Sequence, residues 1–289
     1  MSRLSARIGR RSSRTATGGV RLTSSTPDAL WNAPAARLLR PAAVTCTDLT
    51  RGTLLNRCSL SVPVGRRLLV VSEPDASASM LLRILSGLSR PSRGRVELAG
   101  MSDPSTTGWG HRVAYLGPEP SIHGWMTPRE TLELAAELLD LPAAEAERRT
   151  RRAIAWARIP AEALGVPVRR GGPPITQRTG LASALLADPE VLLLDEPLRA
   201  LDAHERARLL RLPGRRRTIV MATRYPASET GIATHVAFLR DGRVAFEEPI
   251  ADLAPDGAPL THAALSARAA SPGPAPEGAV TTNREAVSR

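Results

Sequence analysis

The chain has 289 residues, and 42% of them are hydrophobic, which suffices for one large domain or two small ones with a sizeable core. All 39 basic residues are arginines and the formal net charge is +11. Residues 1–40 hold eight arginines against one acid, a net +7, so the remainder carries only +4 and does not suggest a nucleic-acid-binding groove. No apolar run approaches the roughly 20 residues of a membrane-spanning helix, so we expect a soluble or peripheral protein with no nucleic-acid partner.

Both ends of the chain are predicted to be disordered. Residues 1–40 are rich in Arg, Ser and Thr without periodicity, and residues 254–289 are rich in Ala, Pro, Ser and Gly. The first segment also has the acid-poor composition of an organelle transit peptide, a less favoured interpretation because no amphipathic pattern persists. Its arginines could instead hold anionic lipid, although disorder alone explains its composition. Cys46 and Cys58 are expected to be reduced core residues, since no secretory signal is visible.

Between these segments, short apolar strands alternate with helical patterns. A Thr cap with a Pro just inside it starts a helix at Thr127, and an Asp-Gly pair marks the turn of a hairpin in residues 235–249. The alternation predicts an α/β fold whose parallel sheet is covered on both faces. In chain order, we expect strand 66–72, helix 80–88, strands 95–100 and 112–117, helices 127–141, 144–159 and 179–187, strands 191–195 and 218–223, and the hairpin.

Two adjacent acids, Asp195 and Glu196, end the apolar strand VLLLD. Ligands of a parallel sheet lie beyond the carboxyl ends of its strands. One acid there could hold Mg²⁺, and its neighbour could orient an attacking water. Because any buried strand can end in acids at a loop, the pair alone is a weak signal, whereas the longer stretch ALLADPEVLLLDEPLRALD, residues 184–202, is far more specific.

That stretch resembles the Walker B strand and D-loop of ATP-binding cassette (ABC) ATPases, the nucleotide-binding subunits of ABC transporters. The segments LLRILSGLSRPSRGRVELAG, VAYLGPEPSIHGWMTPRETLEL and VAFLRDGRVAFEEP match other parts of the family in the same order. The resemblance implies a P-loop NTPase-like parallel sheet core of ABC ATPase type over residues 41–253. It also implies an inserted helical subdomain at about 123–183 and an antiparallel β part.

The same resemblance assigns roles to residues and partners to the chain. Asp195 takes the magnesium-side position, Glu196 the position of the catalytic base, and Asp202 the end of the D-loop. ATP and Mg²⁺ are the implied cofactors. The implied partners are a separate transmembrane permease and a second ABC ATPase subunit, identical or different. Such a chain would lie in the cytoplasm, peripheral on the inner face of the cell membrane.

The phosphate loop departs from the family pattern. Its aligned stretch is SEPDASAS, in which Ala78 takes the position of the phosphate-binding lysine, and Glu73 and Asp75 place negative charge where the triphosphate would lie. Because the chain contains no lysine, only an arginine such as Arg83 or Arg224 could replace it, which would make the chain an active but divergent ATPase. The remaining positions aligned with the loop are Ser72 and Ser77 at glycine positions, Ser79 at the magnesium-ligand position, and Met80.

The other nucleotide motifs also depart. The signature motif aligns with GGPPI, whose two prolines lack N–H donors, and the adenine-stacking aromatic expected near residues 50–55 is missing. Each ATP of an ABC dimer lies between one subunit's phosphate loop and the other's signature, so we predict weak or absent ATP binding, impaired hydrolysis and an idle Glu196. The alternative is a pseudo-ATPase scaffold or regulatory module without a transport role. The substituted positions are Gly171, Gly172, Pro173, Pro174 and Ile175 in the signature, Pro118 at the Q-loop glutamine and Arg224 at the switch histidine.

A few remaining residues have plain structural interpretations. Arg215–Arg217 is expected to be a solvated turn, and Arg169–Arg170 to face water. The five histidines lack metal-ligand spacing. Trp125 and Trp156 are expected to be packing residues, although Trp125 could instead contact a coupling helix of the permease.

Overall fold

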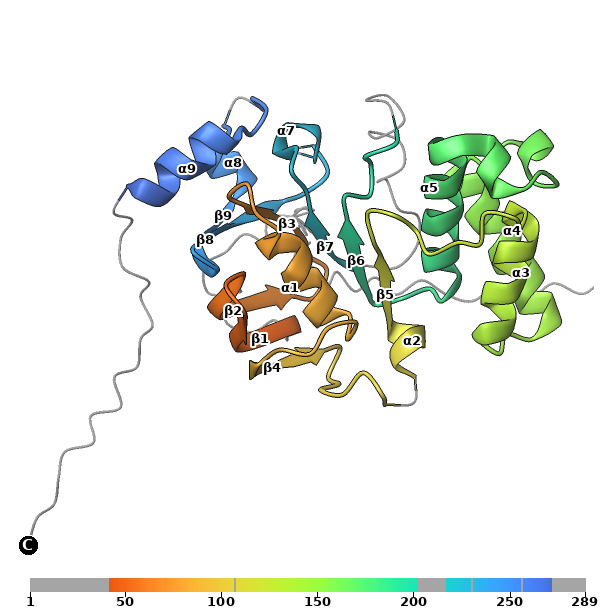
Figure 1. The fold of residues 1–289 in the computed structure, drawn as a ribbon, viewed down its shortest axis with the longest axis horizontal. Coiled ribbons are helices and arrows are strands. Elements are labelled where there is room, and N and C mark those ends of the chain that lie inside the picture. The colour runs from red at the N-terminus through yellow and green to blue at the C-terminus, as the bar shows by residue number, and fades with distance from the viewer. Residues whose placement is uncertain (1–41, 107, 202–216, 230, 256, 272–289) are drawn as a thin grey trace, which may run out of the picture. The chain divides into compact units, whose positions relative to one another are not determined.

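The computed structural model describes residues 42–106, 108–201, 217–229, 231–255 and 257–271 (Figure 1). The predictions for residues 1–40 and for Asp202 concern parts of the chain outside these ranges. Among the described helices, none combines the length and apolar character needed to cross a membrane.

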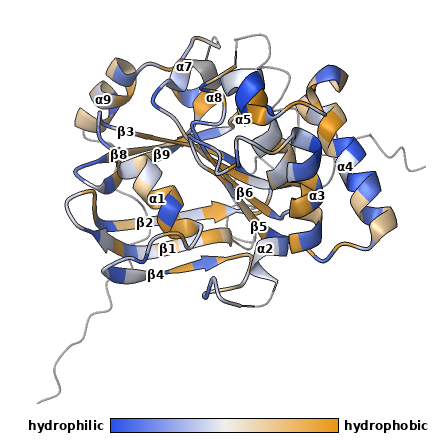
Figure 2. Ribbon diagram, turned by 45° about the vertical axis from the view of Figure 1, so that its right-hand side comes forward, coloured by the Kyte–Doolittle hydropathy of each residue, from blue (hydrophilic) through white to orange (hydrophobic). Residues whose placement is uncertain are grey.

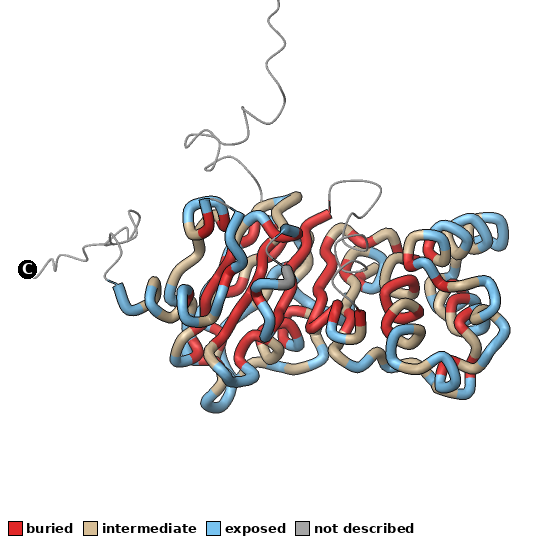
Figure 3. The backbone as a smooth tube through the Cα atoms, turned by 90° about the horizontal axis from the view of Figure 1, so that it is seen from above, coloured by how far each residue is buried: buried red, intermediate tan, exposed pale blue. Residues whose placement is uncertain are grey.

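The core of the fold is a six-stranded sheet in the order β5-β6-β7-β3-β8-β9. All neighbouring strands are parallel except the last pair, which forms the predicted antiparallel hairpin. Every residue of β6 and β7 is buried, which is why these strands are continuously apolar rather than alternating. Figure 3 shows these buried strands crossing the centre of the molecule. The strands are β3 Arg67–Ser72, β5 Val113–Leu116, β6 Val191–Asp195, β7 Thr218–Ala222, β8 His235–Arg240 and β9 Arg243–Pro249.

A second, antiparallel sheet has the order β2-β1-β4. Its strands are β1 Ala42–Arg51, β2 Leu55–Pro63 and β4 Arg93–Leu98. Helix α1, Ser77–Leu85, lies between the two sheets, and its apolar residues join both in one core (Figure 1). Cys46 and Cys58 are free and buried in this core, as expected.

The helical subdomain consists of α3 Pro128–Leu138, α4 Ala143–Ala157, the short 3₁₀ helix Ala161–Ala163 and α5 Val168–Leu186. The predicted cap of α3 is a full capping box: Thr127 Oγ1 accepts from the Glu130 N–H at 3.2 Å, and Glu130 Oε2 accepts from the Thr127 N–H at 2.8 Å. Trp156 packs against the subdomain core, as predicted. The packing prediction for Trp125 is wrong, because 64% of its surface is exposed and its ring stacks only on His123.

Polar and apolar residues divide α4 into two faces. Its arginines lie mainly on the wet side, while Ala153 and Ala157 are buried against α3 and α5 (Figure 2). Arg169 and Arg170 are exposed, as predicted. The solvated-turn prediction is wrong for Arg217, which is 8% exposed and forms an ion pair with Asp188. Arg215 and Arg216 lie outside the described residues.

The segment after residue 254 differs from the predicted disorder. Residues His262–Ala270 form helix α9, which lies beside the β8–β9 hairpin (Figure 1). Leu265 is 1% exposed within the core around β8, and Arg268 pairs with Glu248 while its guanidinium lies 5.5 Å from the Phe246 ring centroid. The sequence HAALSARAA contains a single large apolar residue, Leu265. It therefore shows no helical hydrophobic periodicity from which α9 could have been predicted. The remaining short helices are α2 Trp109–Arg112, α7 Pro226–Glu229 and α8 Ile250–Leu253.

If α9 is part of the folded domain, Leu265→Ala should destabilise the whole domain. Removing a fully buried leucine costs about 2–5 kcal/mol. The exposed Ala267→Ser on the same helix should change the free energy of unfolding by only about 0.5 kcal/mol. Urea unfolding followed by circular dichroism measures both. Equal stability of Leu265→Ala and the parent chain would show that α9 contributes nothing to the fold.

Candidate functional site

The loop between β3 and α1, aligned with the phosphate loop, is closed on itself. Asp75 Oδ1 accepts a hydrogen bond from the Ser77 N–H at 2.9 Å, at the first residue of α1. Ser72 Oγ donates to the Asp75 carbonyl at 3.3 Å, and the Asp75 N–H donates to the Glu73 carbonyl. A backbone donor at the helix N-terminus, where an anion is favoured, is therefore already bound to an internal carboxylate.

The residues that follow in α1 turn into the protein interior. Ala78, at the lysine position, is 6% exposed and belongs to the core between the two sheets. Ser77 Oγ donates to the Leu54 carbonyl at 2.8 Å, and Met80 packs partly buried against the same core. Of the two acids of the loop, Glu73 forms an ion pair with Arg240, the last residue of β8. Glu73 Oε1 lies 3.2 Å from Arg240 Nε. The described loop thus holds no cation of its own, and its outer acid is paired with an arginine from another strand.

The predicted metal-site pair, Ser79 and Asp195, is brought together. Ser79 Oγ donates to Asp195 Oδ1 at 2.9 Å, and Tyr115 Oη donates to Asp195 Oδ2 at 3.4 Å. Burial raises the pKa of the Asp195 carboxyl, although these two hydrogen bonds and the charges of Arg224 and Arg83 lower it in part. Burial, together with the nearby Asp195 charge, raises the pKa of Tyr115 to about 12. Tyr115 was not among the predicted site residues, because its place on β5 gives no sequence signal.

Glu196, the predicted base position, faces the residue at the switch-histidine position. Its Oε1 accepts from the Arg224 N–H at 2.7 Å and lies 3.9 Å from Arg224 Nε. Glu196 adopts a φ of 50°, an uncommon left-handed conformation for a glutamate that turns the chain sharply after β6. Burial is the main cause that raises the pKa of Glu196, and the Asp195 charge adds to it. Asp195 and Glu196 thus meet different partners, although they are adjacent in the chain.

A histidine does reach this region, but from α9. His262 Nε2 lies 3.0 Å from the Arg224 carbonyl oxygen, so the C-terminal helix contacts the loop that carries Arg224. Sequence reasoning missed His262 because it lies in the segment predicted to be disordered. Arg83 is exposed on α1 and lines a different cavity from the phosphate loop.

The region aligned with the signature contains a kink in α5. Gly172 has φ 72° and ψ −173°, and Pro173 and Pro174 open the second part of the helix. Thr176 Oγ1 donates to the Gly172 carbonyl at 3.1 Å, and buried Gln177 donates through Nε2 to the Pro197 carbonyl at 2.9 Å. Gly171 packs against Ile175, since a Cβ on this glycine would lie 2.7 Å from the Ile175 Cβ.

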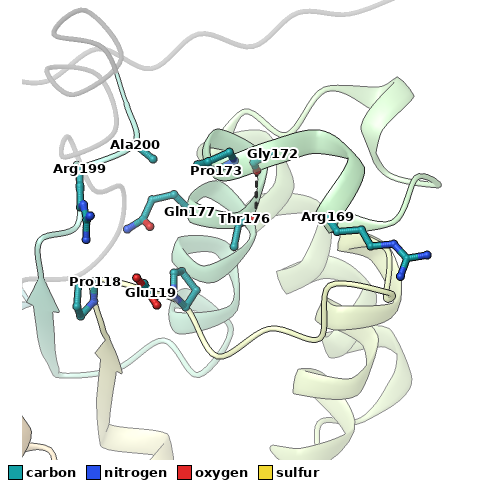
Figure 4. A pocket seen from close by; sticks show the side chains of 10 residues that line it. Pro118, Glu119, Arg169, Gly172, Pro173, Thr176, Gln177, Arg199 and Ala200 are labelled. Atoms are coloured by element: carbon teal, nitrogen blue, oxygen red, sulfur yellow. Dashed lines mark hydrogen bonds between the residues drawn. The ribbon is translucent and has the colours of Figure 1, made fainter.

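A cavity of about 530 Å³ joins the Q-loop position to the signature position. Figure 4 shows Pro118 and Glu119 facing Gln177 and Thr176 across it, with Arg199 from the segment after β6 on the same side as Pro118. Close packing of Gly180 supports this arrangement, because a Cβ there would come within 2.8 Å of Leu116 Cδ1. Pro118 from the predicted Q-loop position therefore shares one cavity with Gly172 and Pro173 of the predicted signature, and no residue of the aligned phosphate loop lines it. Its lining residues are Pro118, Glu119, Pro120, Arg169, Gly172, Pro173, Thr176, Gln177, Arg199 and Ala200.

Comparison with known proteins places this arrangement in a family. The family model described as "ABC transporter" matches residues 55–199, about half of the chain. The chain belongs to the ABC transporter family. Among curated members, the aliphatic sulfonates import ATP-binding protein SsuB of Corynebacterium glutamicum is 32% identical over 215 residues, covering 71% of this chain and 83% of that protein. The nickel import ATP-binding protein NikO of Rhodobacter capsulatus is 34% identical over 230 residues, covering 73% and 89%. For the ABC transporter ATP-binding protein all4389 of Nostoc, which is 32% identical, the match spans 66% of this chain and 58% of the relative.

Solved structures of the ABC transporter family share the fold. The ATP-binding cassette MJ0796, solved as a dimer bound to ADP and Pi, superimposes with a TM-score of 0.62 at 19% identity, covering 72% of this chain and 98% of that chain. A structure described as the ATP binding subunit of an ABC transporter gives 0.64 at 21% identity, covering 78% and 99%. The predicted α/β ABC ATPase fold, with its helical subdomain and antiparallel β part, is confirmed.

The buried carboxyl of Glu196 should make stability depend on pH. Because its pKa is raised in the folded state, the unfolded chain releases this proton first as pH rises, and folding loses stability over that range. Glu196→Gln keeps an oxygen for the Arg224 N–H and removes the charge. It should therefore be more stable than the parent near pH 7, with no advantage near pH 3.

Urea midpoints measured across this pH range test the expectation. Glu133→Gln, at an exposed carboxylate of α3, is the matched control for the loss of one charge. A Glu196→Gln variant less stable than the parent near pH 7 would show that the ionised carboxylate stabilises the fold.

Proposed function

We propose that this chain is the ATP-binding-type subunit of an ABC importer, docked on a separate membrane permease, with ATP hydrolysis impaired or absent at its own nucleotide positions. The import ATP-binding proteins SsuB and NikO among its relatives support the importer assignment. The impairment rests on one observation: the Asp75 carboxylate binds the Ser77 N–H at the start of α1.

A triphosphate does not fit the phosphate loop in this conformation. It would have to displace one carboxylate from the helix N-terminus and approach the second, Glu73, without a lysine to offset the repulsion. Loss of one charge-assisted phosphate contact costs on the order of 2–3 kcal/mol, and like-charge repulsion adds to that cost. Ala78 offers only a methyl group, and this group is directed into the core.

The predicted position for Mg²⁺ keeps side chains that can bind this ion. A serine hydroxyl and a carboxylate are suitable ligands for this ion, which also needs phosphate oxygens and water. Ser79 and Asp195 supply those groups, but in this structure they are hydrogen-bonded to each other. Without a bound triphosphate, the pair lacks the phosphate oxygens that complete such a site.

Glu196 is proposed to be idle as a base. Its carboxylate is engaged by the Arg224 backbone, and the arginine side chain supplies positive charge at the position where the family has a histidine. The cavity lined by Pro118 and Pro173 offers a partner subunit two prolines in place of N–H donors. An ABC dimer containing this chain, with itself or with another ABC ATPase subunit, would therefore carry altered nucleotide positions on both of its contributed surfaces.

The permease contact is proposed at a second cavity, of about 650 Å³, between α1, β5 and α5. Leu88 in its lining is largely exposed, and Ile122 is partly exposed. Trp125 lies three residues beyond Ile122 in the chain, outside the lining of this cavity, and its exposed ring would extend the apolar surface offered to a partner. Such a surface suits a short apolar helix of a membrane partner and would hold the chain at the cytoplasmic face of the membrane.

The closed phosphate loop also supports the alternative, a pseudo-ATPase scaffold without a transport role. Such a scaffold would need neither bound ATP nor a permease. Co-purification with a permease subunit separates the two. Trp125→Ala should abolish co-purification if the chain is a transporter subunit, whereas Trp156→Phe, at the packed tryptophan, should leave it intact. If Trp125→Ala still co-purifies with the permease, as Trp156→Phe is expected to, docking through this surface is contradicted.

Calorimetry with ATP, with and without Mg²⁺, tests the closed loop. The parent chain should show no saturable binding in the micromolar range. The variant Asp75→Gly/Ser77→Gly/Ala78→Lys removes the internal carboxylate and introduces Gly and Lys at two of the aligned loop positions, so it should bind ATP at least about tenfold more tightly. Asp75→Asn keeps the size of the side chain and should improve binding by less.

Thermal unfolding of each variant controls for misfolding, since Ala78 is buried. Micromolar ATP binding by the parent chain, or ATP turnover that Glu196→Gln abolishes, would contradict impaired nucleotide chemistry and support the active, divergent ATPase.

A further inference from the structure

A cluster of arginines lines a small cavity on the helical subdomain, away from the nucleotide positions. The cavity has a volume of about 190 Å³ and lies where α4 meets the end of α5 and the start of β7. None of the residues aligned with nucleotide motifs lines it. Its lining residues are Glu145, Arg148, Arg149, Arg152, Ala153, Trp156, Leu185, Asp188 and Arg217.

Internal partners account for part of this charge. Arg148 and Arg149 share Glu145, with Arg148 Nε 3.0 Å from Oε2 and Arg149 Nε 2.5 Å from Oε1. Arg149 also donates to the Leu186 carbonyl at 2.9 Å, which offsets the negative end of α5. Arg217 pairs with Asp188. Four guanidinium groups against two carboxylates leave a formal charge of +2 around the cavity.

An exposed guanidinium group and a buried indole N–H of the lining have no protein partner in the described part of the chain. Arg152 makes no hydrogen bond or ion pair with any described residue, whereas its neighbour Arg151 pairs with Glu147 outside this cavity. The Trp156 Nε1–H is buried and has no acceptor in the described part of the chain. A buried donor without a partner is costly, and an ion or water that accepts from it is a common explanation.

We propose that this cavity binds a phosphate group as a dianion, in the form of inorganic phosphate or a phosphomonoester. A dianion matches the excess charge of +2, and the planar guanidinium forks suit the oxygens of a tetrahedral anion. The indole N–H supplies a neutral donor after a small adjustment that exposes it to the ligand. Ala153 and Leu185 add an apolar wall for the carbon skeleton of an ester.

Calorimetry on the full chain tests this site with inorganic phosphate and with glycerol 3-phosphate, against sodium chloride at equal ionic strength. We expect saturable one-to-one binding of at least one phosphate ligand and none of chloride. Arg152→Gln should weaken that binding by about tenfold, because it removes one charge-assisted contact. Arg151→Gln is the matched control and should bind like the parent.

Trp156→Phe tests the indole donor, because it keeps an aromatic ring at this position and removes the N–H together with part of the ring. We expect severalfold weaker phosphate binding by calorimetry, with thermal unfolding as the control for lost packing. Equal weakening by Arg151→Gln and Arg152→Gln would mean general screening and would overturn the site. Absence of phosphate binding in the parent, or binding only to vesicles of phosphatidic acid, would also overturn it.

Discussion

The proposed loss of ATP binding depends on one contact, the hydrogen bond between the Asp75 carboxylate and the Ser77 N–H. A helix N-terminus attracts an anion because its first N–H groups have no partner within the helix. In this chain the anion is a side chain of the same loop, so the attraction is satisfied during folding. Ala78, the next residue of α1, is buried in the core and offers no charge to offset that carboxylate.

The central sheet brings the remaining site residues to one edge. Parallel pairing of β3, β6 and β7 aligns their carboxyl ends, so residues far apart in sequence come within hydrogen-bond distance. Ser79 meets Asp195 across 116 positions, and Glu196 meets Arg224 across 28. The shared fold therefore brings together residues of the predicted site that are remote in sequence.

Sequence patterns predicted the elements with strong local signals. The capping box at Thr127, the apolar strand ending at Asp195 and the Asp-Gly hairpin turn all form as expected, because each depends on neighbouring residues. Helix α9 was missed because its stability depends on Leu265 entering a core built by distant strands. The predictions for Arg217 and Trp125 were wrong because burial of these side chains also depends on distant segments. Arg217 is buried and pairs with Asp188, whereas most of the Trp125 surface is exposed.

The sequence by itself determined the family and the order of the main strands and helices after residue 66, because these follow from local periodicity and from motifs aligned along one chain. Only the tertiary structure decided which groups the side chains of the predicted site contact. It placed the Asp75 carboxylate on a backbone donor, turned Ala78 inward, set Arg224 against Glu196 and gathered four arginines around Trp156. Such contacts depend on distances between segments that are remote in sequence, and the spacing of residues along the chain does not predict these distances.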